Sequence, residues 1–291
     1  MRASGLSDAL GLRPLEVRTV LLPLSSSTAS DSALGPAREL AEHFGAQLRV
    51  LTVGIEKEEV DAMAEHVAEL TRSAPATLDV WVDWDVSGSI LAASRQQEGT
   101  VVCMASHARG RLGELVLGSY TSPLLADTTD PVLLVGPDFA PARKLTDGPV
   151  WACVDGSPTS EQVIPVAARW ASALDVPLEI VTVAEPALAG LDERDPSRGH
   201  GRRRNPRGYV GALAEKWQRP GLEVSGYVVF DPIGAAQGLA EALETRPCGM
   251  LAVTTHAHSG LRRVVFGSQA TAIVRHSPVP VLVVPPEHDA A

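Results

Sequence analysis

The sequence predicts an α/β protein built from two tandem, doubly wound, five-stranded parallel sheets. One observation is that short, continuous apolar runs alternate along the chain with longer segments of helical periodicity. This alternation is typical of βαβ units, whose parallel sheet is covered by helices on both faces. The second observation is an internal repeat, because His107 and Gly118 recur as His256 and Gly267, both displaced by 149 positions. A period this long indicates a duplicated domain rather than a solenoid.

The elements of the first half follow from this alternation. Apolar runs of strand length are bounded by turn residues, and the segments between them carry apolar residues at helical spacing. We expect strands at 18–24, 47–53, 78–84, 100–106 and 132–136. We expect helices at 31–45, 60–74, 89–97 and 119–128.

The second half repeats the same order with one insertion. We expect strands at 150–155, 178–183, 222–230, 249–255 and 279–284, and helices at 160–174, 208–218, 235–244 and 268–276. Ser25 and Asp155, at corresponding strand ends, are only 130 positions apart, so the second half carries 19 extra residues, mostly within 191–208. This segment is rich in Arg, Gly and Pro and lacks apolar periodicity, which predicts a loop. Its arginines could fold over an anion near the strand ends, and a solvated loop is the alternative.

This organisation predicts an N-terminal extension at 1–15, a first domain at 16–146 and a second domain at 147–287. The last strand of each half, 132–136 and 279–284, is apolar, and an apolar sheet edge must be paired or covered. We expect these two edges to pair across a pseudo-two-fold axis, which would make one chain an internal dimer. A further association into a homodimer is left open.

Composition restricts the classes of function. The chain has 291 residues, 45% of them hydrophobic, which is enough for two buried cores. A formal net charge of −10 and an aromatic content of 4% argue against a nucleic-acid partner. Cys103, Cys153 and Cys248 are an odd, sparse set, which predicts reduced core thiols in a cytoplasmic protein. No apolar run resembles a signal peptide or reaches the ~20 residues of a membrane helix.

Ligands of open α/β sheets bind beyond the carboxyl ends of the strands. The end of the first strand in each half, Ser25 or Asp155, reaches that edge. The carboxylate of Asp155 can accept hydrogen bonds from an adenine amino group or a ribose hydroxyl. A turn or helix-capping role for Asp155 is equally compatible with the spacing. Serine is shorter and uncharged, so the first half should hold the same ligand less well.

The loop after the fourth strand ends in Gly-Ser at a predicted helix start, as Gly118-Ser119 and as Gly267-Ser268. A helix N-terminus attracts anions, and a glycine before it lets a phosphate approach the backbone. Ser119 and Ser268 can each cap the helix and donate a hydroxyl. The plain alternative is that Gly-Ser serves only as a helix cap.

Three motifs together resemble the universal stress protein family in its tandem form. They are CVDGSPTSEQ at 153–162, the loop ending in Gly-Ser, and PVLVV at 280–284. The resemblance covers about 16–286 and implies a Rossmann-like fold and a role in the stress response. It also implies ATP or a related adenine nucleotide, with or without Mg²⁺, as the ligand.

In the nucleotide-binding members of that family, a loop G-x-x-G-x9-G-[S/T] holds the phosphates and the early aspartate meets the adenine. Both loops of this chain keep the spacing but lack the first two glycines, and an added Cβ narrows the approach to the backbone. The resemblance implies a second-half site at Asp155, Val183, Thr254, Ala257, Gly267, Ser268 and Gln269. The weaker site of the first half would use Ala105, Ala108, Gly118 and Ser119. We therefore expect nucleotide binding chiefly in the second half.

Other kinds of site find little support. His256 and His258 have no evident third ligand, so no metal site is predicted. A G-x-S-x-G nucleophile elbow after a strand and a general acid/base pair are also missing. The sequence favours a regulatory binding protein, at most a slow ATPase. The alternative is a nucleotide-free module of the same fold for dimerisation and partner contact, which the missing glycines favour and Asp155 opposes.

Overall fold

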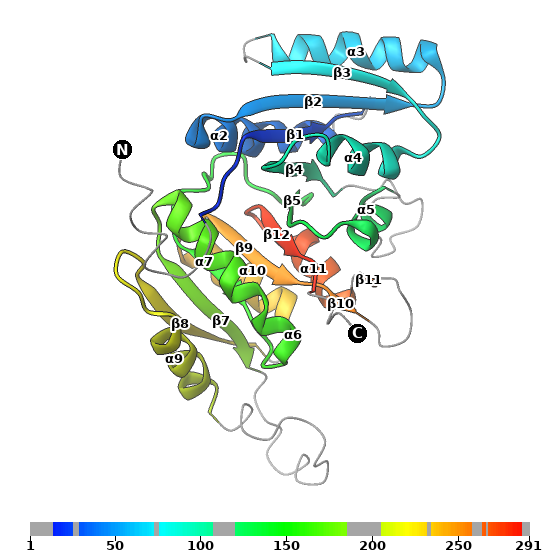
Figure 1. Cartoon of the computed structure of the whole chain (residues 1–291). Helices are drawn as coiled ribbons and strands as arrows, with labels where there is room; N and C mark the ends of the chain where they lie inside the picture. The colour runs from blue at the N-terminus through cyan, green and yellow to red at the C-terminus, as the bar shows by residue number, and fades with distance from the viewer. Residues whose placement is uncertain are drawn as a thin grey trace, which may run out of the picture.

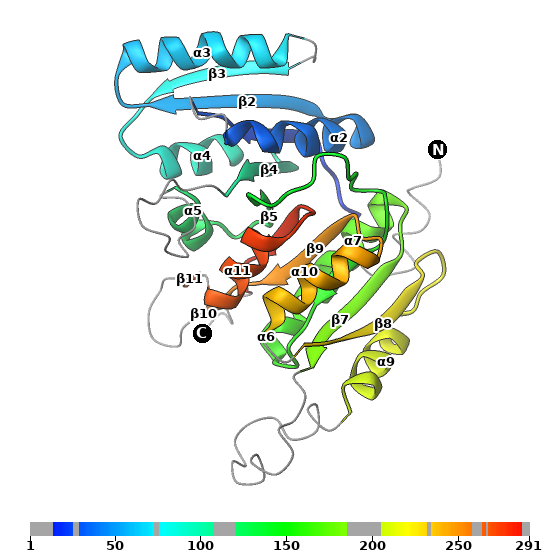
Figure 2. The same ribbon diagram turned by 180° about the vertical axis from the view of Figure 1, so that it is seen from behind.

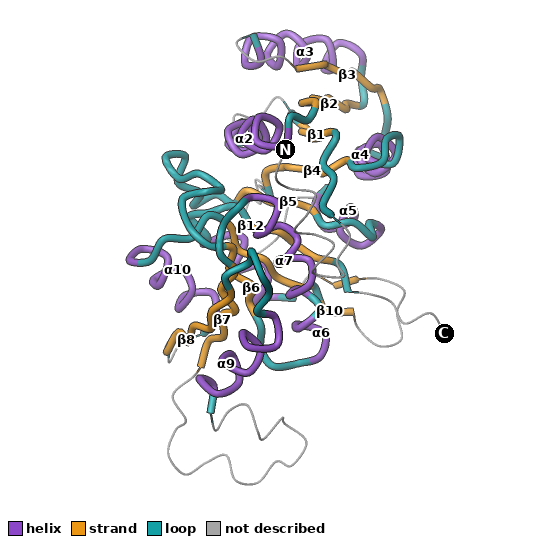
Figure 3. The backbone as a smooth tube through the Cα atoms, turned by 60° about the vertical axis from the view of Figure 1, so that its left-hand side comes forward, coloured by secondary structure: helices purple, strands orange, loops and turns teal. Residues whose placement is uncertain are grey.

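The structure is a computed structural model that describes residues 14–25, 29–72, 76–106, 120–184, 205–231, 234–257, 264–265 and 267–286. Strands and helices alternate through both halves of the chain (Figure 1). The strands gather in the middle of the molecule and the helices lie on both sides of them (Figure 3). None of the helices in these ranges combines the length and the hydrophobicity needed to span a membrane.

The first half contains the elements that its apolar runs predict. Its strands are β1 (Thr19–Pro23), β2 (Gln47–Gly54), β3 (Ala76–Val82), β4 (Thr100–Ala105) and β5 (Val132–Val135). Its helices are the 3₁₀ turn η2 (Ser30–Ala33), α2 (Leu34–Phe44), α3 (Lys57–Thr71), α4 (Val86–Ser94) and α5 (Thr121–Asp127). The helix α3 begins three residues before the predicted start at Val60, because a solvated first turn carries no apolar signal.

The second half repeats this order. Its strands in the main sheet are β6 (Val150–Cys153), β7 (Leu178–Ala184), β8 (Val224–Phe230), β9 (Met250–Thr254) and β12 (Val281–Val284). Its helices are α6 (Pro158–Glu161), α7 (Val163–Leu174), α9 (Pro206–Trp217), α10 (Ala235–Thr245) and α11 (Ser268–His276). Two further strands of two residues each, β10 (His256–Ala257) and β11 (Val264–Val265), pair antiparallel outside the main sheet. The sequence did not predict them.

The predicted loop at 191–208 needs a correction at its end. Residues 191–204 lie outside the described residues, whereas Pro206–Gly208 already belong to α9. The Asn205 side chain accepts a hydrogen bond from the Gly208 N–H at 2.9 Å, and Pro206 occupies the first turn. Both are helix-start signals, because asparagine caps the free N–H groups and proline has its φ preset for the first turn.

The strands of the two halves join in one sheet of ten strands in the order β3-β2-β1-β4-β5-β12-β9-β6-β7-β8. Neighbours within each half are parallel. The two halves meet where β5 and β12 pair antiparallel, with Leu133 opposite Leu282 (Figure 1). The predicted pairing of the two last strands is therefore confirmed, and we call this pair the central seam.

Successive strand residues face two hydrophobic cores on opposite sides of the sheet. In β1, Val20 and Leu22 belong to the core beneath α2, α7 and α9. Leu21, between them, belongs to the core beneath α4, α5, α10 and α11. The helix α7 lies on the near side in Figure 1, and α10 and α11 lie on the near side in Figure 2. Each half is therefore doubly wound, as the apolar strand pattern predicts.

The connection between β5 and β6 is tied to both halves. The Leu145 N–H donates to the Glu39 carboxylate of α2 at 2.8 Å, and Leu145 itself is buried. The Ala140 N–H donates to the Pro278 carbonyl at 3.0 Å, and Arg143 donates to the Leu243 carbonyl at 2.7 Å. This connection thus holds the two halves in place alongside the central seam.

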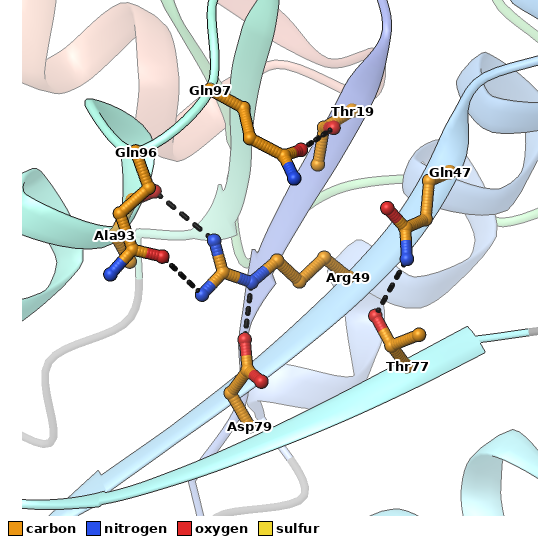
Figure 4. A network of polar contacts seen from close by, with 8 residues as sticks. All are labelled: Thr19, Gln47, Arg49, Thr77, Asp79, Ala93, Gln96 and Gln97. Atoms are coloured by element: carbon orange, nitrogen blue, oxygen red, sulfur yellow. Dashed lines mark hydrogen bonds and ion pairs between the residues drawn. The ribbon is translucent and has the colours of Figure 1, made fainter.

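Each half also carries a charged residue on its second strand, but with opposite sign. Arg49 in β2 pairs with Asp79 and donates to the Gln96 side chain at 2.7 Å and to the Ala93 carbonyl at 3.3 Å (Figure 4). Glu179 holds the matching place in β7, since the two residues pair with corresponding positions of β1 and β6.

Glu179 is buried and pairs with Arg246 at 2.8 Å. The guanidinium of Arg246 lies 4.0 Å from the ring centre of Tyr227, which adds a cation–π contact. Arg49 holds the segment that follows α4 against the sheet, and Glu179 holds the segment that follows α10. The charge on the strand is therefore positive in the first half and negative in the second.

Candidate functional site

A cavity of about 240 Å³ opens at the carboxyl edge of the second half's sheet. There β6 lies between β7 and β9, so the strand order reverses, which is where open α/β sheets bind ligands. The walls are Cys153, Val154, Asp155, Ser160, Val181, Val183, Ala235, Leu239, Val253, Thr254, Gly267, Ser268, Gln269, Ala270 and Ile273. They come from the ends of three strands, from the turn after β6 with α6, and from α10 and α11, and most of them are apolar.

The turn after β6 fixes Asp155 in the cavity wall. The Asp155 carboxylate accepts a hydrogen bond from the Ser157 N–H at 2.8 Å, and the Asp155 N–H donates to the Ser160 hydroxyl at 3.1 Å. Gly156 between them has a φ of 88°, a conformation that glycine adopts readily. The turn role that the spacing allowed is thus present, and it also orients the carboxylate beside the cavity.

Ser25 occupies the same place in the first half. Its N–H donates to the Ser30 hydroxyl at 3.2 Å, as the Asp155 N–H does to Ser160. The backbone of the turn is therefore repeated, while the side chain that could meet a ligand differs. The first half has a short hydroxyl where the second half has a carboxylate.

The N-terminus of α11 supplies a positive end to the cavity. Gly267 is the N-cap and no side chain caps the helix, so the predicted capping role of Ser268 is wrong. Gly267 has an extended backbone, so Ser268 is the first helical residue and lies beyond the cap position. The first N–H groups of a helix lack partners within it, and α11 has no acidic residue in its first turn. These N–H groups are available to an anion.

Thr254 at the end of β9 is the most unusual polar residue of the cavity. Its side chain is 8% exposed, and its hydroxyl has no hydrogen-bond partner within the described residues. A buried hydroxyl without a partner costs about 1–3 kcal/mol. Thr254 lines the cavity, so a ligand placed there can supply the partner.

The structure brings six of the seven second-half site residues to this cavity: Asp155, Val183, Thr254, Gly267, Ser268 and Gln269. Ala257 lies in β10 opposite Val264, and its side chain is outside the described residues. In the first half, Ala105 ends β4 and is half-buried. Ala108, Gly118 and Ser119 lie outside the described residues.

Sequence reasoning missed the apolar walls. Leu239 and Ile273 lie on the buried faces of α10 and α11, where helical periodicity indicates core residues without distinguishing a core from a cavity. Cys153 ends β6 and also lines the cavity. Burial raises the pKa of its thiol to about 12, so the thiol is neutral at physiological pH. Burial also raises the thiol pKa values of Cys103 and Cys248.

A model of the universal stress protein family matches residues 148–285. This range contains all the strands of the second half and every residue of the cavity wall. The second half of the chain is therefore similar to the universal stress protein family.

Similar proteins bear the same family name. A universal stress protein of Mycobacterium tuberculosis is 30% identical over 201 residues, which are 64% of this chain and 62% of the relative. A second one from that species is 28% identical over 210 residues, 69% of each chain. The chain thus spans about 62% of the length of the first of these curated relatives.

Solved structures show the same fold. A universal stress protein from Archaeoglobus fulgidus aligns with a TM-score of 0.63 at 19% identity, covering 92% of this chain and 98% of that one. A putative universal stress protein from Pseudomonas aeruginosa aligns with a TM-score of 0.59 at 18% identity, covering 93% and 94%. Both alignments extend over both halves of the ten-stranded sheet.

Proposed function

We propose that this chain is a stress-response regulatory protein of the universal stress protein type that binds ATP or a related adenine nucleotide, chiefly in the cavity of its second half. The observation that supports this most directly is the convergence of Asp155, Thr254 and Ser268 on one cavity. They come from three different elements, the turn after β6, the end of β9 and the start of α11, and the first of these lies far from the other two in the sequence.

The chemistry of the walls suits the parts of such a ligand. Val181, Val183 and Leu239 offer an apolar surface to a purine ring. The carboxylate of Asp155 can accept hydrogen bonds from an amino group or a ribose hydroxyl. The N-terminus of α11 can hold a phosphate. The cavity is slightly below the ~300 Å³ at which ligand pockets begin, which suits a ligand whose phosphates lie at the rim.

The test uses natively purified protein. We expect nucleotide to be released on denaturation, and added ATP to raise the melting temperature. A ligand at 100 times its Kd stabilises the folded state by about 2.7 kcal/mol. Asp155→Ala should reduce the shift, because it removes the acceptor in the cavity wall. The matched control is Ser25→Ala, at the same place of the first half, which should leave the shift unchanged.

Two results together would refute this function: no nucleotide released from the wild-type protein, and no change of its melting temperature with ATP. The chain would then be the nucleotide-free interaction module of the same fold. If Ser25→Ala reduced the shift as much as Asp155→Ala, binding would not be confined to the second half.

A further inference from the structure

Exposed apolar side chains gather at the outer corner of the first half, where β2 and the edge strand β3 end (the right-hand end of both strands in Figure 1). Six large apolar side chains are exposed among the described residues, and four of them lie at this corner: Ile55, Val80, Val82 and Trp84. We call these four residues the corner patch. Single apolar side chains on a surface are ordinary, whereas a cluster of them indicates an interaction site.

Trp84 is the largest member of the corner patch, and its side chain is 83% exposed. The turn that carries it is held on both sides. The Asp83 N–H donates to the Gly54 carbonyl at 2.9 Å, which ties the turn to β2. The Asp85 carboxylate accepts from the Gly88 N–H at 2.8 Å and caps α4. Because this backbone is already ordered, binding through the indole has few further groups to immobilise.

The residues next to the corner patch are acidic. The stretches 54–58 and 80–86 contain four exposed carboxylates and one exposed ammonium group, which give them a net charge of −3; these residues are Glu56, Glu58, Asp83, Asp85 and Lys57. Hydrogen bonds from the Asp85 N–H and the Ser89 hydroxyl lower the pKa of Asp83, so this carboxylate is charged at physiological pH. Two corner patches facing each other would bring like charges together. The corner patch therefore fits a cationic partner better than a second copy of itself.

The second half shows how an aromatic side chain at the equivalent corner is covered. Phe230 holds the place of Val82, since each is the last residue of the third strand of its half. Phe230 is also exposed, and the guanidinium of Arg207 in α9 lies 5.8 Å from its ring centre. A cation over an aromatic ring is attracted by the ring. Trp84 has no such contact within the described residues, so a cation from another molecule can take that position.

We propose that the corner patch binds a basic segment of a partner protein, a segment that carries apolar side chains as well as arginine or lysine. The apolar side chains of the segment cover the aliphatic members of the patch, and one of its cations lies over the Trp84 indole. The neighbouring carboxylates attract its remaining positive charges. This surface lies at the opposite end of the first half from the central seam, whereas the candidate cavity lies at β6, β7 and β9. The inference is thus independent of nucleotide binding.

The probe is a short, fluorescently labelled peptide in which arginine and leucine alternate, and anisotropy measures its binding to the full chain. We expect saturable binding that weakens as salt is added, because part of the attraction is electrostatic. A peptide of alternating arginine and serine keeps the charge and lacks the apolar side chains. A peptide of alternating glutamate and leucine reverses the charge. Both should bind at least about tenfold more weakly than the arginine–leucine peptide.

Variants of the corner patch test the two parts of the surface. Trp84→Ala should weaken binding of the arginine–leucine peptide about tenfold, because it removes the largest apolar contact and the ring that meets the cation. Glu56→Gln combined with Glu58→Gln removes two negative charges. This double variant should bind the peptide more weakly, and its affinity should depend less on salt.

The second half supplies matched controls. Phe230→Ala removes the exposed aromatic side chain of the equivalent corner. Glu215→Gln combined with Glu223→Gln removes two exposed carboxylates of the same half. Both controls should bind the arginine–leucine peptide as the wild type does. Melting curves check that each variant folds, which the exposure of all these side chains leads us to expect.

Several results would overturn the inference. One is an affinity that Trp84→Ala leaves unchanged, and another is an affinity that Phe230→Ala lowers equally, because binding would then not be specific to the corner patch. Equal binding of the arginine–serine peptide would mean that charge alone attracts the probe. Sedimentation velocity of the protein without peptide examines self-association. A dimer that Trp84→Ala dissociates would assign the corner patch to a second copy of the chain in place of a basic partner.

Discussion

Among single residues, Gly136 makes one of the closest backbone contacts of the molecule. It follows β5, at the end of the central seam. A Cβ added there would lie 1.9 Å from the Val274 carbonyl oxygen of α11. Since that neighbour is backbone, it cannot turn aside as a flexible side chain would. Gly136 therefore lets the first half pack directly against a helix that borders the candidate site.

We predict that Gly136→Ala lowers the free energy of unfolding by about 1–3 kcal/mol, because the added carbon forces the backbone of α11 to shift. Gly211→Ala is the control, since a Cβ at Gly211 in α9 meets nothing within 4 Å. It should raise stability by about 0.5–1 kcal/mol through helix propensity. Urea unfolding of both variants measures the difference. Equal stability of Gly136→Ala and wild type would contradict the prediction.

Glu39 gives a prediction on pH. Burial raises its pKa, although the Leu145 N–H bond acts in the opposite direction. A carboxyl whose pKa is raised in the folded state is easier to accommodate there when it is protonated. Its contribution to the free energy of unfolding is therefore lost as the pH rises through the raised pKa and the group becomes charged. Glu39→Gln keeps an acceptor oxygen for Leu145 and removes the charge.

The variant should therefore be at least as stable as the wild type at pH 7, and its advantage should shrink as the pH falls toward 4. Urea unfolding at the two pH values measures this. Glu42→Gln, at a solvent-exposed place of the same helix, is the control. An advantage of Glu39→Gln that is larger at pH 4 than at pH 7 would contradict the expected sign.

At the scale of elements, apolar run length was the reliable signal. The strands of the main sheet were predicted within a few residues, because apolar runs mark them. Strands such as β1, β4 and β9 are almost wholly buried, whereas the edge strand β3 has no fully buried residue. The hairpin of β10 and β11 was missed because two-residue strands show no periodicity. The start of α9 was missed because Asn205 and Pro206 lie in an arginine-rich segment, and composition hid their helix-start chemistry.

The candidate site also has features that the sequence predicts and features that only the structure shows. The sequence predicted that Asp155 and Ser268 lie at the carboxyl edge of the sheet, where both line the cavity, because strand ends and helix starts follow from the alternation of elements. Spacing left open whether Asp155 serves a turn, and the structure shows that it does. That the Thr254 hydroxyl has no partner depends on neighbours from other elements, so no local pattern could reveal it.

At the scale of the whole molecule, the continuous sheet predicts cooperative unfolding. The central seam is buried, with Leu133 and Leu282 both fully shielded from solvent. We expect one calorimetric transition, with equal calorimetric and van't Hoff enthalpies. Leu282→Ala should lower the stability of the entire chain by about 2–5 kcal/mol.

Val82→Ala is the control, because Val82 is 57% exposed on the edge strand β3, and it should have little effect. Differential scanning calorimetry of both variants provides the measurement. Two separate transitions, of which only one responds to Leu282→Ala, would show that the halves unfold independently.

The central seam has a consequence for concentration. An interface between separate subunits dissociates on dilution, whereas the seam joins two halves of one chain, and residues 136–149 connect these halves. Its strength is then set by an effective local concentration and does not depend on the concentration of the protein. The two halves that meet at the seam need not have the same sequence. The second half can keep the carboxylate of Asp155 at the end of its first strand while the first half carries Ser25 there, and both halves still fold as one unit.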